Sequence, residues 1–292
     1  MRNFASCLSE HAVRVSDTSC SGGGGGAISS SSSNISLTLS DRSMKNSVTC
    51  FYKTRLSTCK ELFFNLTWSK TNTGPSLSIA IDDNIQVLRK KEGNKSYKHQ
   101  DSLISLYWDF SSARYTCGCL EPAENFYLVI MADAEFALLL GDLSRDFVRM
   151  SENSCVPIAD FSLVSREEQA FTNGVYRTKA WFLDSGKVHE ITIKCMKESG
   201  LWVWVDKKKV VQEQRLDWNF RGNQIVFIDG LSVDFLWDVF DLQFGGPSGC
   251  GVFAFRTRSS LESRLWLEEE VVQQKEHNFS GFSLLIQAFK SL

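Results

Sequence analysis

The sequence predicts an all-β protein, an antiparallel β-sandwich or barrel-like assembly built from two related halves, with one C-terminal helix. Three observations lead to this prediction. Short apolar runs recur along the chain, glycine-containing pairs separate several of them, and two long stretches of sequence resemble one another. A spacing of about 8–12 residues per strand and turn is typical of sandwiches and barrels. The amphipathic helices that a parallel βαβ arrangement needs are not evident between these runs.

Two dipeptides that end in glycine give the clearest strand boundaries. Asn173-Gly174 and Asp229-Gly230 each lie between apolar runs. Such pairs supply the positive φ angles that a type I′ hairpin turn requires, so both predict hairpins. Further hairpins are expected where Phe126–Met131 returns as Phe136–Leu140, where Trp181–Asp184 turns through Ser185-Gly186 into His189–Cys195, and where that strand turns into Leu201–Val205.

The ends of the chain differ from its centre. Residues 1–45 are rich in Ser and Gly and bury too little to offset the entropy of ordering, which predicts a disordered tail, open to regulation by phosphorylation. An all-β domain is expected over residues 46–292. Ser259 and Glu262 can form a capping box, which predicts a helix over 260–274. Residues 282–289 are expected to form a closing strand that completes a sheet edge.

Two stretches, approximately 46–145 and 160–258, resemble one another. The period is far longer than the ~20–50-residue unit of a solenoid, so it predicts an internal duplication. Two similar sandwiches or one pseudo-symmetric assembly would both fit. The matched segments keep their order at offsets of 124 to 129 residues: Leu77–Asp82 with Leu201–Asp206, Gly93-Asn94 with Gly222-Asn223, Leu106–Phe110 with Phe235–Val239, and Phe126–Ile130 with Gly251–Phe255.

Composition and charge exclude few classes of protein. The chain has 292 residues, 43% of them apolar and 23% charged, which is enough for a sizeable core. A net charge of −2 provides no positive field for phosphate backbones, so nucleic acid is disfavoured as a partner. No apolar run is long enough to predict a transmembrane segment.

The cysteines and the first residues favour the cytoplasm or the nucleus. Nine cysteines is an odd count, and their spacing shows no disulfide framework of the kind that small secreted domains use. No apolar run of a secretory signal follows Arg2, so thiols in a reducing compartment are expected. A plastid transit peptide is disfavoured because Glu10 and Asp17 interrupt the serine-rich start.

The sequence contains no recognisable catalytic or metal-binding constellation. Asp234 and Asp238 share strand parity but would lie ~13 Å apart, beyond the ~5–9.5 Å of glycosidase pairs. Cys117 and Cys119 are expected on one side of a strand as buried thiols, because the four histidines show no metal spacing. We therefore expect no enzyme activity, cofactor or metal.

Four tryptophans are candidate ligand-binding residues: Trp202, Trp204, Trp108 and Trp237. Trp202 and Trp204 share one face of a predicted strand, ~6.7 Å apart. If that face is buried, the strand is an inner strand of a sandwich. If the face is open, the two rings form a stacking platform for a sugar or an aromatic ligand.

Basic residues form a second set of candidates, this time for partner binding. They follow matched strands of the two halves and are Lys90, Lys91, Lys207, Lys208 and Lys209, with Arg89 beside the first pair. Two such patches could hold a phosphorylated or acidic partner. Lysines that protect sheet edges from aggregation would give the same pattern.

Several segments resemble a known family. Leu216–Asn223, followed by Asp229-Gly230 and Leu236–Val239, is similar to the central signature of a plant family catalogued as domain of unknown function number 868. Other similar segments are Ser47–Cys50, Tyr107–Ala113, Leu138–Asp142, Leu163–Arg166 and Phe282–Ile286. The chain departs from the family between Ile81 and Arg89, where other members carry an additional aromatic and basic stretch. The resemblance implies a plant source, and no residue roles follow from it.

These observations favour a non-enzymatic β-scaffold that acts as a protein-interaction module in plant cells. The alternative is a small-ligand binding protein with an aromatic-lined cavity for a lipid, sugar or metabolite. A carbohydrate-active hydrolase is the third hypothesis. A closed core favours the scaffold, a cavity of a few hundred Å³ with one or two polar groups favours the ligand binder, and facing carboxylates would favour the hydrolase.

Overall fold

A computed structural model describes residues 44–71, 74–150, 156–183, 186–196, 200–246, 249–258 and 281–290. The predicted helix over 260–274 lies outside the described residues, as does the predicted tail except for Met44 and Lys45. These two residues are the first of strand β1, so the folded part begins slightly earlier than expected. Two short helices that the sequence analysis did not predict, α1 and α2, follow strands.

The elements of the first part of the chain are β1 (Met44–Arg55), β2 (Glu61–Thr71), β3 (Gly74–Ile81), β4 (Asn84–Leu88), β5 (Glu92–His99), β6 (Ser102–Asp109), β7 (Arg114–Tyr115), β8 (Pro122–Glu124), β9 (Tyr127–Ala132), β10 (Glu135–Leu140) and α1 (Ser144–Met150). Those of the second part are β11 (Asp160–Thr172), β12 (Val175–Ala180), β13 (His189–Met196), β14 (Gly200–Val205), β15 (Lys208–Glu213), β16 (Arg221–Ile228), β17 (Leu231–Asp238), α2 (Phe240–Phe244), β18 (Cys250–Thr257) and β19 (Ser283–Lys290).

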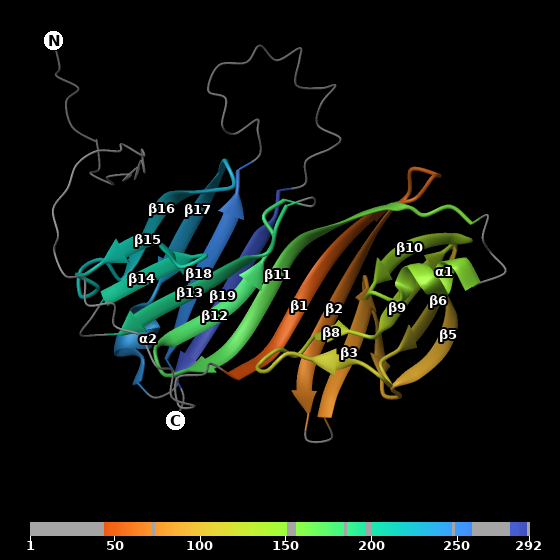
Figure 1. The fold of residues 1–292 in the computed structure, drawn as a ribbon, viewed down its shortest axis with the longest axis horizontal. Helices are drawn as coiled ribbons and strands as arrows, with labels where there is room; N and C mark the ends of the chain where they lie inside the picture. The colour runs from red at the N-terminus through yellow and green to blue at the C-terminus, as the bar shows by residue number, and fades with distance from the viewer. Residues whose placement is uncertain are drawn as a thin grey trace, which may run out of the picture.

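A nine-stranded sheet runs through the whole molecule in the order β16-β17-β18-β19-β11-β1-β2-β3-β4 (Figure 1). Two four-stranded sheets, β10-β9-β6-β5 and β12-β13-β14-β15, pack on its two ends. All strand pairs are antiparallel except β11 with β19. The prediction of a mostly antiparallel β fold is therefore confirmed, and no sheet of the described part closes into a barrel.

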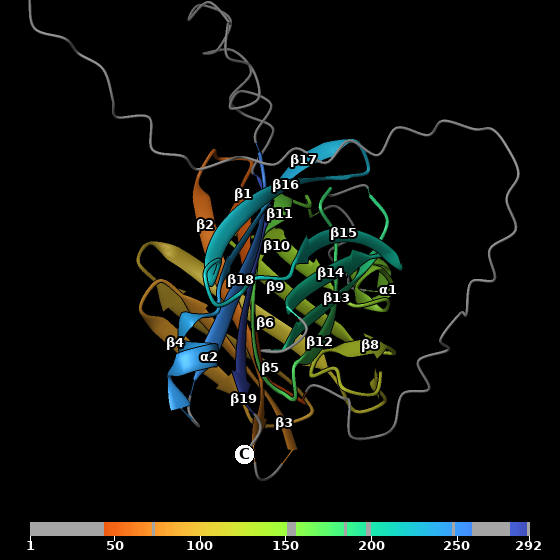
Figure 2. The ribbon, with the colours of Figure 1, turned by 90° about the vertical axis from the view of Figure 1, so that its left-hand side faces the viewer.

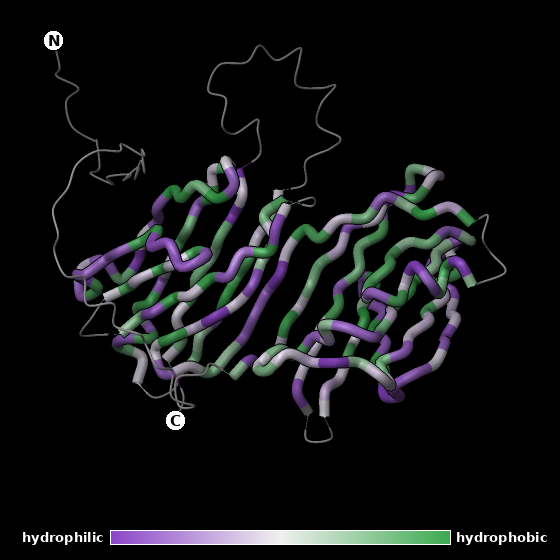
Figure 3. Tube along the Cα trace, in the orientation of Figure 1, coloured by the Kyte–Doolittle hydropathy of each residue, from purple (hydrophilic) through white to green (hydrophobic). Residues whose placement is uncertain are grey.

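Strands β1 to β10 form the first unit, in which alternate side chains of two layers meet in one hydrophobic core. In β6, for example, Ile104 and Leu106 are fully buried, while Ser105 between them is half-buried. This alternation is visible along most strands as changes between hydrophobic and hydrophilic positions (Figure 3). It follows from the period of two residues in a strand, which sends successive side chains to opposite faces.

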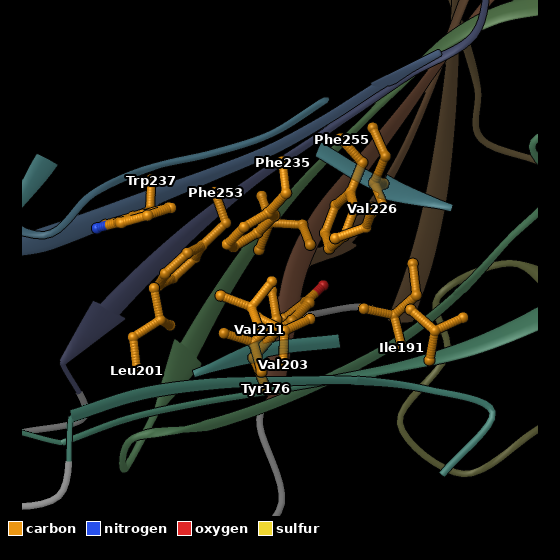
Figure 4. Close-up of a cluster of buried hydrophobic side chains, with 14 of the residues drawn as sticks. Tyr176, Ile191, Leu201, Val203, Val211, Val226, Phe235, Trp237, Phe253 and Phe255 are labelled. Atoms are coloured by element: carbon orange, nitrogen blue, oxygen red, sulfur yellow. The ribbon is translucent and has the colours of Figure 1, made fainter. Parts of the chain in front are cut away.

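Strands β12 to β19 form the second unit, with a separate core. The β12–β15 layer lies beside the β16–β19 layer (Figure 2). Aromatic side chains of β17 and β18, such as Phe235, Phe253 and Phe255, face aliphatic side chains of the other layer (Figure 4). Each unit thus contains a run of four paired strands followed by a second run of four. Whether this correspondence between the two units arises from a duplication stays a prediction.

The glycine turns have different outcomes. Asp229-Gly230 joins the paired strands β16 and β17, and both residues have positive φ angles of 50° and 79°, so this hairpin is confirmed. The hairpin between β9 and β10 is also confirmed. The prediction for Asn173-Gly174 was wrong, because β11 and β12 belong to different sheets. Strand β11 has β1 and β19 on its two sides, so the turn carries the chain into the other layer instead.

Two further strand predictions need correction. Strand β12 ends at Ala180, so Trp181 does not begin a strand leading into β13. The predicted closing strand exists as β19, but it lies inside the nine-stranded sheet between β18 and β11, and not at an edge. Its apolar alternation allows this, because Leu284, Ile286 and Ala288 are all buried in the core of the second unit.

Candidate binding cleft between the two units

Strand β11 joins the two units and carries charged side chains toward the interior. Arg166, Glu168, Ala170 and Thr172 are buried, whereas Glu167 and the other intervening residues are exposed. The two units have separate cores on either side of this region. A buried arginine and a buried glutamate are rare unless they are paired, so their partners define what this junction does.

Glu168 accepts hydrogen bonds from several donors. The Nζ of Lys45 lies 3.0 Å from its Oε1, the Nε of Arg166 lies at 2.6 Å, and the hydroxyl of Thr178 at 2.8 Å. The hydroxyl of Tyr176 donates to the second carboxylate oxygen. Strands β1, β11 and β12 are therefore tied together at one carboxylate, which is only 1% exposed.

Arg166 extends this network to the first unit. Its two terminal nitrogens donate to the two carboxylate oxygens of Glu121, with 2.7 Å between Nη1 and Oε1. Glu121 lies just before β8, in the segment that reaches from the first unit toward β11. A bidentate pair of this kind fixes both position and orientation, because the guanidinium fork matches the carboxylate geometry.

The charges of this network hold Glu168 and Arg166 in their ionised forms. Burial alone would raise the pKa of Glu168, but the charges of Arg166 and Lys45 and the hydrogen bond from Tyr176 outweigh it and lower the pKa to about 2. Burial opposes the charge of Arg166 too, yet Glu121 and Glu168 raise the pKa of Arg166 well above its ordinary value. Glu168 and Arg166 are thus fixed charges across the pH range of the cell.

Two neutral groups border the network. The thiol of Cys50 lies 3.4 Å from Nη1 of Arg166, and burial together with the charge of Glu121 raises its pKa far above the ordinary value. Burial and the neighbouring Glu168 raise the pKa of Tyr176 in the same direction. Cys50 therefore stays a thiol, which is a poor nucleophile, and acts as a packing group.

An open cleft of about 730 Å³ lies between the units and borders the network. Its walls come from the turn between β7 and β8 on one side and from β12 and the segment after it on the other. The lining residues are Lys45, Thr116, Cys117, Gly118, Cys119, Glu121, Pro122, Ala123, Arg166, Arg177, Thr178, Lys179, Trp181, Val188 and Glu190.

Cys117 and Cys119 lie at the rim of this cleft. Both thiols are exposed, and the residues form a turn between β7 and β8, so the predicted buried thiols on a strand were wrong. The amide of Cys119 donates to the carbonyl of Thr116, which closes the turn. No group of three or more potential metal ligands occurs in the described part of the chain.

Strand β12 gives the cleft its remaining polar character. Thr178 points inward to Glu168, so Arg177 and Lys179 project from the opposite face of the strand. The Nε of Arg177 is buried and has no hydrogen-bond partner among the described residues, and Lys179 is exposed. Trp181 follows the strand with 43% of its surface exposed.

The four candidate tryptophans are not brought together. Trp108 and Trp237 are buried in the two separate cores, and their indole N–H groups donate to the carbonyls of Lys90 and Asn219. Trp202 and Trp204 are half-buried on the other face of β14, away from the core, and their rings are stacked at 6.1 Å. The Nζ of Lys209 lies 4.8 Å from the centre of the Trp202 ring. The Trp202 ring therefore has the Trp204 ring and the ammonium group of Lys209 as neighbours, and whether the pair binds a ligand stays a prediction.

The candidate lysines are also dispersed. Lys90 and Lys91 are exposed in the connection between β4 and β5 of the first unit. Lys207 lies in the turn between β14 and β15, with a φ of 69°, and the other two lysines begin β15. These positions are not equivalent in the two units, because β14 matches β3 and not β4. The lysines that line the cleft are others: Lys45 and Lys179.

The aspartates with shared strand parity have arginine partners. Asp234 pairs with Arg258, with 2.8 Å between Oδ1 and Nη2, and Asp238 pairs with Arg221 at 2.7 Å. Neither aspartate faces another carboxylate in these pairs. The geometry accounts for both aspartates as members of ion pairs with arginine.

Sequence reasoning missed the charged network altogether. Lys45 was assigned to the tail, and Glu121 and Glu168 gave no motif. The one available signal was indirect: Cys50 and Arg166 each lie in a segment that resembles the plant family, and these two segments meet at the floor of the cleft.

The comparison with protein families agrees with that resemblance. The family described as plant protein of unknown function (DUF868) matches residues 43–290. The chain belongs to this family. The match includes every residue of the charged network and of the cleft. No curated protein and no solved structure matches the chain. Among the described residues, no helix is long and apolar enough to span a membrane.

Proposed function

We propose that this DUF868 protein is a non-enzymatic scaffold that binds a protein partner, and that the cleft beside β12 receives an extended acidic segment of that partner. One observation carries the proposal. Strand β12 is an edge strand of its sheet in the described structure, and its open side lines the cleft. Its side chains Arg177 and Lys179 form no ion pair with the described residues.

The backbone of β12 supports an extended partner. Its other edge pairs with β13, and the amide of Cys195 donates to the carbonyl of Gly174, which sets the alternation of the ladder. In an antiparallel pair, every second residue directs its N–H and C=O groups away from the partner strand. Arg177 and Lys179 are at these outward positions. An added strand could therefore form main-chain hydrogen bonds with this edge.

The charges of the cleft support an acidic partner. Four cationic side chains line it against two carboxylates: Lys45, Arg166, Arg177 and Lys179 against Glu121 and Glu190. Arg166 and Lys45 are already engaged by Glu121 and Glu168. Arg177 and Lys179 are left for the partner, and opposite charges across an interface increase association rate and specificity. The pairing of the groups beneath the cleft with one another supports binding over catalysis.

Two further parts of the proposal concern origin and location. The equal order of strands in the two units and the tryptophan–glycine contact that recurs in both support an internal duplication. No disulfide joins the six cysteines of the described part, which supports an intracellular compartment.

The test uses two synthetic hexapeptides, one alternating Glu and Val and the other alternating Lys and Val, with the full-length protein in titration calorimetry. We expect the acidic peptide to bind and the basic peptide to bind at least tenfold more weakly. N-methylation of alternate amides of the acidic peptide removes the donors facing β12 and should weaken its binding by a similar factor.

Charge reversal then locates the site. The double variant Arg177→Glu/Lys179→Glu should lose binding of the acidic peptide. The matched control is Lys90→Glu/Lys91→Glu, which changes the same charge on an exposed connection of the first unit. Unchanged binding by the β12 variant, or loss in the control variant instead, would refute the cleft as the partner site.

A further inference from the structure

A second cavity, separate from the cleft, lies between the two layers of the second unit. Its volume is about 350 Å³, within the ~300–1,000 Å³ of small-molecule sites. Strands β12 and β13 form one wall, β18 and β19 the other, and α2 covers part of it. The lining residues are Thr172, Asn173, Gly174, Tyr176, Ile193, Cys195, Met196, Leu242, Gln243, Phe253, Ala288 and Lys290.

Most of this lining is apolar or neutral. Ile193, Phe253 and Ala288 are buried members of the second core. Burial raises the pKa of the Cys195 thiol to about 12, so it remains uncharged and behaves as a small apolar group. The cavity therefore suits the hydrocarbon part of a small molecule.

Gln243 is the exception in this apolar lining. Its Nε2 and Oε1 are both buried, and neither has a hydrogen-bond partner in the described structure. Other polar groups of the lining are engaged: Thr172 donates to the carbonyl of Val175, and the Nζ of Lys290 donates to the carbonyl of Gly246. Buried amide groups are almost always paired, so an amide with both atoms unpaired beside a cavity points to a missing partner.

We infer that this cavity binds a small molecule with an apolar body and a planar head group, a primary amide or a carboxylic acid, that pairs with the side-chain amide of Gln243. Both head groups, the acid in its protonated form, present a donor and an acceptor side by side. They match the carbonyl oxygen and the amino group of the glutamine in one two-bond pair. The inference goes beyond partner binding at β12, because the cavity and the cleft share no lining residue.

The experiment uses three probes with the same body: 4-phenylbutanamide, 4-phenylbutanoic acid and butylbenzene. Binding to the full-length protein is followed by NMR of ¹³C-labelled methionine methyl groups. Met196 lines the cavity, and Met150 is 85% exposed on α1 and serves as an internal reference. We expect the amide or the acid to shift the Met196 signal alone, at concentrations at least tenfold below those that butylbenzene requires. Comparing the affinity of the amide probe with that of the acid probe distinguishes the two head groups.

The variant Gln243→Leu keeps the approximate volume of the side chain and removes both polar atoms. It should lose at least tenfold in affinity for the amide and the acid while retaining butylbenzene. Gln214→Leu changes an exposed glutamine after β15 and should bind all three probes normally. Thermal unfolding confirms that each variant is folded, and Gln243→Asn provides a second, milder change at the same position.

Three results would overturn the inference: no shift of Met196 at millimolar probe, equal affinity for butylbenzene and the polar probes, or unchanged head-group preference in Gln243→Leu. The β12 variant Arg177→Glu/Lys179→Glu should bind the probes like the wild type. Failure at the cavity is thereby separated from failure at the cleft.

Discussion

The two units contain the same tryptophan–glycine contact, held with different tightness. Trp108 on β6 lies opposite Gly93 on β5, and Trp237 on β17 lies opposite Gly222 on β16. In each unit the indole N–H donates to the carbonyl three residues before the glycine. A Cβ at Gly93 would lie 3.0 Å from the ring, whereas a Cβ at Gly222 would lie only 2.2 Å away. Similar sequence therefore predicts the contact but not how closely it is packed.

A histidine contact shows the same difference. The matched strands β3 and β14 are each followed by an aspartate with a φ of 49°, Asp82 in the first unit and Asp206 in the second. His99 reaches Asp82 at 2.9 Å, with the carboxylate largely exposed. His189 is 3% exposed and bridges Asp206 and Asp229, both at 2.9 Å. The second unit is thus tied more firmly at its turns than the first.

The largest expected effect is at β11, where the two units are joined. Glu168→Ala should lower the free energy of unfolding by about 3–5 kcal/mol, because it leaves Arg166 and Lys45 as buried charges without a partner. Urea denaturation measures the loss. Glu167→Ala, one residue earlier on the exposed face, is the control and should change stability by less than about 0.5 kcal/mol. Equal effects of the two variants would contradict the role of the network.

The same carboxylate should make the junction sensitive to acid. The pKa of Glu168 is lowered in the folded state from 4.5 to about 2, so its contribution is complete above pH 4.5 and is lost as the pH falls toward 2. At about 1.4 kcal/mol per pKa unit this amounts to about 3 kcal/mol. Urea unfolding at several pH values should show a shallower decline in this window for Glu168→Gln than for the wild type. Parallel curves would exclude Glu168 as the titrating group.

Whether the sequence predicts a structural feature of this protein depends on how close together in the chain the residues that form it lie. The Asp229-Gly230 turn and the hairpin of β9 and β10 depend on neighbouring residues, and both were predicted. The Glu168 network was not, because Arg166, Glu167 and Glu168 are all charged, so a period of two cannot tell the inner face from the outer. Its other members come from β1 and from the segment before β8, which only the tertiary fold brings to β11.

The tryptophan pair shows the limit for a single strand. Because Trp202 and Trp204 are two residues apart, strand alternation correctly placed both side chains on one face. It could not predict that the register between β14 and β15 shifts after Val203, which places Lys209 opposite Trp204. That irregularity positions Lys209 to lie over the neighbouring Trp202 ring. A β-bulge of this kind changes which side chains meet on one face of a sheet, and alternation alone does not reveal it.

The difference in packing at the two glycines predicts unequal costs for the same substitution. Gly222→Ala should destabilise the protein by about 3 kcal/mol, because the new methyl group would overlap the Trp237 ring and force it to move. Gly93→Ala should cost about 1–2 kcal/mol, because the Trp108 ring needs to yield only slightly and the cost comes mainly from the φ of 158° at Gly93, which alanine rarely adopts. Chemical denaturation of both variants gives the comparison. Equal losses would mean that the two contacts are equally tight in solution.

Substitution of either histidine should cost less than Gly222→Ala. His189→Ala should lower the free energy of unfolding by about 2 kcal/mol, because it removes two hydrogen bonds to partly exposed carboxylates and the ring contact with Phe182. His99→Ala removes one bond to an exposed carboxylate and should cost about 0.5 kcal/mol or less. The two variants are compared by urea denaturation, and amide hydrogen exchange then shows where protection is lost. In His189→Ala, we expect amides to lose protection from exchange around both turns that the ring bridges, at Asp206 and at Asp229. In His99→Ala, we expect this loss only around the turn at Asp82. A larger loss in His99→Ala would reverse the ranking of the two units.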